Sequence, residues 1–121
     1  MIDSSLTLDI SSETLGSTVV VRVAGDVDMR SAPEFERALM EAMYRLVPPS
    51  ALVADLTGVE FIGSHGLAVL LRLHLRCAGT GRRFLVVADR RVVLRPMELT
   101  SLRTALTVLP TLVDALAEHV A

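Results

Sequence analysis

The chain has 121 residues, of which 51% are hydrophobic, 21% charged and only 3% aromatic, with a formal net charge of −2. These values indicate a folded chain of single-domain length with an aliphatic core. The balanced charge gives no electrostatic basis for direct binding of nucleic acid. The apolar runs are shorter than the roughly 20 residues that cross a bilayer, and the start does not resemble a signal peptide. We therefore expect a cytoplasmic protein without membrane association.

The first part of the chain predicts a β-hairpin followed by a helix. Residues 6–10 alternate between apolar and polar, as in a half-buried strand. A turn is expected over residues 11–14, and the β-branched run at 19–24 is typical of a second strand. Ser31 is the expected N-cap of a helix that ends before Pro48. The apolar face of this helix is formed by Phe35, Ala38, Leu39, Ala42, Met43 and Leu46.

The rest of the chain alternates strands and helices. The apolar runs at 51–56 and 84–88 are typical of strands that are covered on both faces. Further elements are expected in this order: a loop over 57–63, a helix from about Ser64 to Ala78, a helical stretch from Asp89 that Pro96 breaks or delays, a strand at 105–108, and a final helix after Pro110–Thr111.

This alternation predicts an α/β fold, with a mixed sheet of four to five strands and about four helices packed on it. We expect one domain over residues 1–121, with an N-terminal strand at about 5–10 and the core at about 18–120. The single cysteine, Cys77, cannot form an internal disulfide and is expected to be a packed thiol.

Three segments resemble the signature of the bacterial STAS-domain anti-sigma-factor antagonists. The main one runs from Asp55 to Leu67: a strand ends in Asp-Leu-Thr, an apolar pair follows, and Gly-Ser-His-Gly-Leu opens a helix. The segment 25–28, Gly-Asp-Val-Asp, resembles the family's Gly-Glu-Leu-Asp turn, and 98–102 resembles its short helix-to-strand passage. The order and spacing of the three motifs carry the resemblance, which extends from about Val19 to Leu116.

The resemblance implies a STAS-like domain that regulates transcription by partner switching. In the family, the antagonist binds an anti-sigma factor that is also a serine kinase, and the sigma factor is released. The kinase phosphorylates the Ser or Thr immediately before the Gly of the motif. The phosphate adds about −1.5 to −2 charges at pH 7, and binding ends. The resemblance implies no catalysis, no cofactor, no metal, and a monomer or weak homodimer. The partner-binding residues that it implies are Asp26, Asp28, Thr57, Gly63, Ser64, His65 and Gly66.

The sequence departs from the family pattern at the phosphoacceptor itself. That position holds His65, and Gly63 stands where the family has Asp. Ser64 matches the family's other serine, which is not the usual acceptor. Three possibilities follow: the antagonist is never switched off by serine phosphorylation, Ser64 accepts the phosphate instead, or the partner and the input signal differ.

Structural roles are the alternatives for these residues. His65 fits an ordinary exposed residue of a first helical turn, and Ser64 fits a helix N-cap. Asp26 and Asp28 fit turn formers, and Asp55 and Thr57 fit residues at the end of a strand.

Other functions fit the sequence less well. A hydrolase elbow needs Gly two residues before the serine, where Ile62 stands. The three histidines are widely spread, so no zinc site is expected. Two alternatives stay open: a STAS accessory subunit of a lipid or anion transport system, and a phosphotransfer protein that uses His65.

Overall fold

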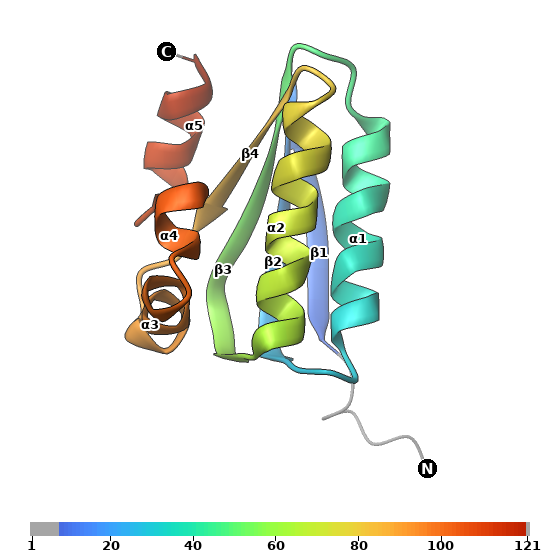
Figure 1. Ribbon diagram of the computed structural model, residues 1–121. Helices are drawn as coiled ribbons and strands as arrows, with labels where there is room; N and C mark the ends of the chain where they lie inside the picture. The colour runs from blue at the N-terminus through green and yellow to red at the C-terminus, as the bar shows by residue number, and fades with distance from the viewer. Residues whose placement is uncertain (1–7, 121) are drawn as a thin grey trace.

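The computed structural model describes residues 8–120, without the side chains of residues 119 and 120. Its five strands form one sheet in the order β1-β2-β3-β4-β5, with β1 antiparallel to β2 and the other neighbours parallel (Figure 1). The strands are β1 (Asp9–Leu15), β2 (Thr18–Val27), β3 (Ser50–Ile62), β4 (Arg82–Val87) and β5 (Thr107–Leu109). The helices are α1 (Ala32–Arg45), α2 (Ser64–Ala78), α3 (Arg91–Leu99), α4 (Leu102–Ala105) and α5 (Leu112–Val120). The predicted α/β class with a mixed sheet is confirmed.

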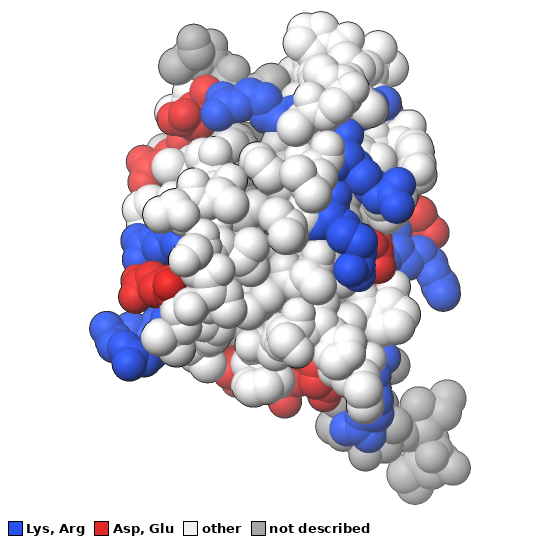
Figure 2. Space-filling view, in the orientation of Figure 1, with Lys and Arg blue, Asp and Glu red and all other residues white. Residues whose placement is uncertain are grey.

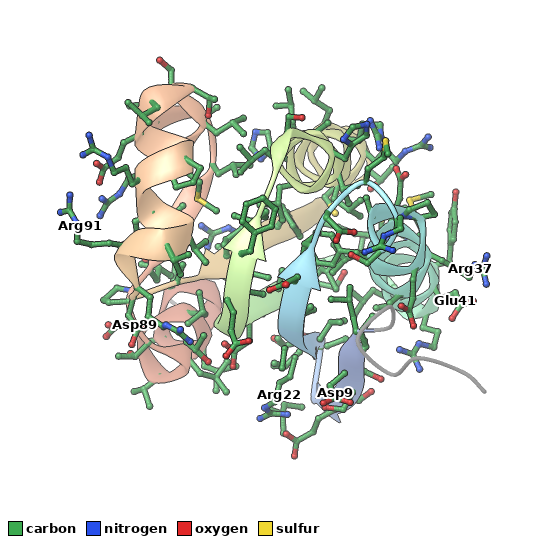
Figure 3. The ribbon with its side chains drawn as sticks, turned by 90° about the horizontal axis from the view of Figure 1, so that it is seen from below. Asp9, Arg22, Arg37, Glu41, Asp89 and Arg91 are labelled. Carbon is green, nitrogen blue, oxygen red and sulfur yellow. The ribbon has the colours of Figure 1, made fainter. Side chains whose placement is uncertain are left out.

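The helices divide unequally between the two faces of the sheet. One face packs against α1, α2 and α3, and its buried side chains alternate along β2 and β3: Val19, Val21, Val23, Leu52, Ala54 and Leu56. The opposite face of β3 and β4 packs against α5, through residues that include Val53, Leu85, Val87 and Ala115. Because β3 and β4 are covered on both faces in this region, residues 51–54 and 84–87 are continuously apolar. Helix α5 contacts β3, β4 and β5, and the cluster that it covers includes Val20 of β2. Strand β1 and the part of β2 near Ala24 have no helix on this face (Figures 1 and 3).

The predicted hairpin is present, but its strand and turn are displaced. Strand β1 includes residues 11–14, which we expected to form the turn, and the turn lies at Gly16, where φ is +63°. Residues 6 and 7 of the predicted strand lie outside the described part of the chain. Strand β1 is an edge strand with mostly exposed side chains, so its polar sequence lacks the apolar alternation that marks a half-buried strand.

Strand β3 also extends further than predicted. The loop expected over 57–63 is strand as far as Ile62, because β2 continues alongside it to Val27. The register between these two strands shifts twice, between Arg22 and Ala24 and between Gly25 and Asp26. These irregularities bend the pair and break the sequence period that would have marked a strand.

The C-terminal third differs from prediction in its boundaries. Helix α3 begins at Arg91, and Pro96 lies inside it without ending it. The expected strand at 105–108 begins only at Thr107, since Ala105 ends the short helix α4. Cys77 is fully buried, as expected, and burial raises the pKa of its thiol to about 11. No helix within residues 8–120 is long and apolar enough to cross a membrane.

Candidate functional site

Strand β3 passes directly into α2 at the signature motif. Gly63 is the N-cap, in an extended conformation, and Ser64 is the first helical residue. The amide of Gly63 donates to the carbonyl of Val27 at 2.9 Å, and the amide of Leu67 donates to the carbonyl of Gly63 at 3.0 Å. The prediction that Ser64 caps the helix is wrong, because no side chain caps α2. The first amides of α2 therefore lack a side-chain acceptor.

Gly66 seats the first turn of α2 against the ends of β2 and β3. A Cβ atom at this position would lie 2.6 Å from Cγ1 of Val27 and 2.8 Å from Cγ1 of Ile62. Only glycine allows so close an approach. Gly66 is buried, whereas Ser64 and His65 are exposed. The packing thus turns the two polar side chains of the motif toward solvent.

The turn between β2 and α1 is closed by its own side chains. The carboxylate of Asp28 accepts from the amides of Arg30 and Ser31, at 2.9 and 3.1 Å. The hydroxyl of Ser31 donates to the carbonyl of Asp26 at 2.7 Å and accepts from the amide of Asp28 at 3.0 Å. Ser31 occupies the N-cap position, but the prediction that its side chain caps α1 is wrong. The hydrogen bond from the Ser31 amide is the main reason that the pKa of Asp28 lies below its ordinary value.

The two turns lie side by side at one end of the sheet. Val27 pairs with Ile62 and Asp26 pairs with Phe61 across the β2–β3 ladder. The structure therefore brings Asp26 and Asp28 close to the segment 63–66, as the family resemblance implied.

Thr57 lies apart from this cluster. It precedes Ile62 by five residues, about 16 Å along an extended strand. Its amide and hydroxyl both donate to Oδ1 of Asp55, at 3.1 and 2.8 Å. The structure thus gives Thr57 a local role beside Asp55 and places it away from the start of α2.

Two apolar residues beside the motif were missed in the sequence. Met29 is 65% exposed and Phe61 is 48% exposed. The ring of Phe61 lies close to Gly63, since a Cβ built on that glycine would be 3.3 Å from Cε2 of Phe61. Strand alternation could have identified Phe61, because Phe61 and the buried Ile62 must point to opposite faces.

Charge is distributed unevenly over the face that carries α2. Figure 2 shows a broad uncharged surface with basic side chains along its right side and acidic side chains at its lower edge, below the start of α2 in that view. Helix α2 itself carries the exposed Arg72 and Arg76. Asp26 and Glu60, both exposed, belong to the strands that end there. Together these features make an uncharged and partly apolar surface with an acidic border, which suits binding of another protein.

The chain belongs to the STAS-domain family. The family model described as "Mlab, STAS domain" matches residues 10–114. The chain is 34% identical over 112 residues to the anti-sigma-F factor antagonist RsfB of Mycobacterium tuberculosis, covering 93% of this chain and 88% of RsfB. It is also similar to the crystal structure of an anti-sigma factor antagonist from Mycobacterium paratuberculosis. That match has 36% identity and a TM-score of 0.88, and it covers 96% of this chain and 97% of the other.

More distant structures share the fold alone. The unphosphorylated form of the anti-sigma factor antagonist SpoIIAA aligns with a TM-score of 0.70 at 18% identity, covering 91% of this chain and 95% of SpoIIAA. Part of the murine anion transporter Slc26a9 aligns with a TM-score of 0.76 at 15% identity, covering 88% of this chain and 18% of the transporter. The same fold thus occurs in proteins with different functions.

Proposed function

We propose that this STAS domain is an anti-sigma-factor antagonist, which binds an anti-sigma factor of the serine-kinase type and so releases a sigma factor. The observation that carries the proposal is the exposed Ser64–His65 pair at the uncapped start of α2, in a chain similar over almost its whole length to named antagonists. The protein acts by binding and not by catalysis.

The proposed binding surface consists of Asp26, Asp28 and residues 63–66, together with Met29 and Phe61. The two apolar side chains are large and exposed, so a partner that covers them gains free energy by removing apolar area from water. The acidic residues at the border favour a partner with basic groups at the matching positions. Thr57 lies outside this surface.

The proposal includes a form of regulation that differs from the family pattern. His65 occupies the position of the usual phosphoacceptor. A serine kinase transfers phosphate to a hydroxyl group, and the imidazole of His65 has none. We propose that ATP therefore leaves the complex intact. Phosphorylation of Ser64, whose side chain is exposed, is the competing outcome of the test.

The experiment is affinity capture on the purified protein from the lysate of its native host, with and without ATP, with bound proteins identified by mass spectrometry. The expected result is recovery of an anti-sigma factor with a kinase-type ATPase domain, retained when ATP is added. Release by ATP, with acid-stable phosphate on Ser64, would contradict the proposed regulation. Recovery of transporter components would contradict the proposed function.

A charge substitution then locates the contact surface. Ser64→Glu places a carboxylate between the partner and the uncharged surface, and we expect the dissociation constant of the captured complex to rise at least about tenfold. Ser12→Glu is the matched control, because Ser12 is an exposed serine on the edge strand β1. An unchanged dissociation constant for Ser64→Glu would show that the start of α2 is not part of the interface.

A further inference from the structure

A hollow lies on the face of the sheet opposite α1 and α2. Its volume is about 390 Å³, within the range of small-molecule sites. Figure 3 shows two of its residues, Asp9 of β1 and Arg22 of β2, projecting from the sheet away from α1 and α2. Helix α5 packs on β3, β4 and β5, which leaves this part of the face uncovered. The lining residues are Asp9, Ile10, Ser11, Arg22, Val23, Ala24, Asp55, Thr57 and Gly58.

Small residues at a β-bulge form part of the hollow's lining. Ala24 is the ladder partner of Gly58, and the register between β2 and β3 shifts just before this pair. A Cβ atom on Gly58 would lie 2.9 Å from the Cβ of Ala24. The backbones approach so closely here that no larger side chain fits at position 58. The depression is therefore fixed by the strands themselves.

Asp55 is a buried carboxylate in the wall of this hollow. It is 8% exposed, and both of its hydrogen bonds with Thr57 use Oδ1. Its ladder partner on β2, Arg22, forms an ion pair with Glu13 at 3.1 Å instead. No ion pair within residues 8–120 includes Asp55. Moving a carboxylate out of water costs free energy that donors and cationic partners offset. Within residues 8–120, the donors to Asp55 are the amide and the hydroxyl of Thr57.

We propose that the hollow binds a small organic cation, an amine or guanidine, whose positive group pairs with Asp55. The hollow has two carboxylates in its lining, and its one guanidinium is already paired with Glu13, so its charge favours a cation over an anion. Asp9, which is exposed on the opposite wall, is positioned to accept from a second donor of the ligand. This site is separate from the proposed partner-binding surface and does not depend on it.

The test is calorimetric titration of the full chain with putrescine and with agmatine, using inorganic phosphate and glycerol as the anionic and neutral comparisons. Asp55→Asn keeps the Oδ1 acceptor for Thr57 and removes the charge. We expect this variant to bind the cations at least about tenfold more weakly, as for loss of a charge-assisted hydrogen bond. Asp89→Asn, which removes an exposed carboxylate outside the lining, is expected to bind like the unmodified protein.

A second variant tests the position of the ligand. Ala24→Leu fills the hollow without changing charge, and we expect it to abolish cation binding. If Ala24→Leu does not fold, Asp55→Asn decides the question alone. The proposal is overturned if neither cation binds at millimolar concentration, if phosphate or glycerol binds as well as the cations, or if Asp55→Asn binds them unchanged.

Discussion

The two helix starts at the same end of the sheet are built in opposite ways. Between β2 and α1, the side chains of Asp28 and Ser31 make four hydrogen bonds with backbone groups of their own turn. Between β3 and α2, the hydrogen bonds of Gly63 are made by backbone groups alone, and the side chains of Ser64 and His65 are exposed.

This difference makes the β2–α1 turn a self-contained element and leaves the start of α2 available for binding. A helix start presents amides that need acceptors, and a turn that supplies its own acceptors leaves few of these amides for a partner. The first amides of α2 have no side-chain acceptor, and the hydroxyl of Ser64 and the imidazole of His65 belong to exposed residues. Because the helix N-terminus also carries partial positive charge, it is a place where added negative charge acts strongly. In the proposed interface, the closed turn supplies a fixed border and the open turn supplies the polar groups that a partner can bind.

The largest effect is expected from breaking the seat of the open turn. Gly66→Ala forces a methyl group against Val27 and Ile62, at distances that no relaxed Cβ contact allows. We expect it to lower the free energy of unfolding by about 1–3 kcal/mol, as for overpacking of a core, measured by urea denaturation. Gly79→Ala is the control, because a Cβ atom on Gly79 would lie 3.8 Å from the carbonyl oxygen of Leu75, an ordinary contact. Equal stability of the two variants would show that the first turn of α2 shifts freely.

The next effect contrasts the two serines directly. Ser31 is 4% exposed and its hydroxyl bonds two backbone groups, so Ser31→Ala should lower the free energy of unfolding by about 1–2 kcal/mol. Ser64 is exposed and does not cap, so Ser64→Ala should change it by less than about 0.5 kcal/mol. Both are measured by urea denaturation. A loss for Ser64→Ala as large as that for Ser31→Ala would show that the Ser64 hydroxyl does stabilise α2.

The fold could be predicted wherever burial imposes a pattern. The apolar runs of β2 and β4 and the periodic face of α1 locate these elements, because buried faces must be apolar. Residues 11–15 of β1 and the second half of β3 could not be predicted as strand. Strand β1 is an exposed edge, and β3 is kept in strand conformation by pairing with a distant segment, through Val27 and Ile62. Local sequence does not encode that pairing.

The site could be predicted in its position but not in its details. The motif places Ser64 and His65 at a helix start, which the structure bears out. The cap roles of Ser31 and Ser64 could not be assigned, because a cap depends on backbone conformation. At the start of α2, the hydrogen bond from Gly63 to Val27 accompanies an N-cap at Gly63, one residue before Ser64. The exposure of Met29 could not be predicted, because a single apolar residue in a turn belongs to no periodic pattern. The family resemblance groups Thr57 with the site, but the extended strand β3 separates Thr57 from Ile62 by about 16 Å.

The smallest expected effect is a pH dependence that belongs to the closed turn. The pKa of Asp28 is held below its ordinary value of 3.8, mainly by the hydrogen bond from the Ser31 amide. The folded state therefore binds this proton less readily than the unfolded chain. The stabilisation is fully present above pH 3.8 and is lost as the pH falls through the lower pKa of the folded state. Asp28→Asn should accordingly flatten the decline of stability below pH 3.8, measured by urea denaturation at a series of pH values.

Glu36 contributes in the same direction, because the hydrogen bond from Arg72 of α2 lowers the pKa of its carboxyl. The comparison is therefore made in a Glu36→Gln background, where the remaining change on Asp28→Asn belongs to the turn. An unchanged pH profile in that background would mean that the Asp28 carboxylate is as easily protonated in the folded chain as in the unfolded one. The hydrogen bonds of Asp28 in the β2–α1 turn would then stabilise the turn no more than hydrogen bonds to water do. The contrast with the start of α2 would be lost.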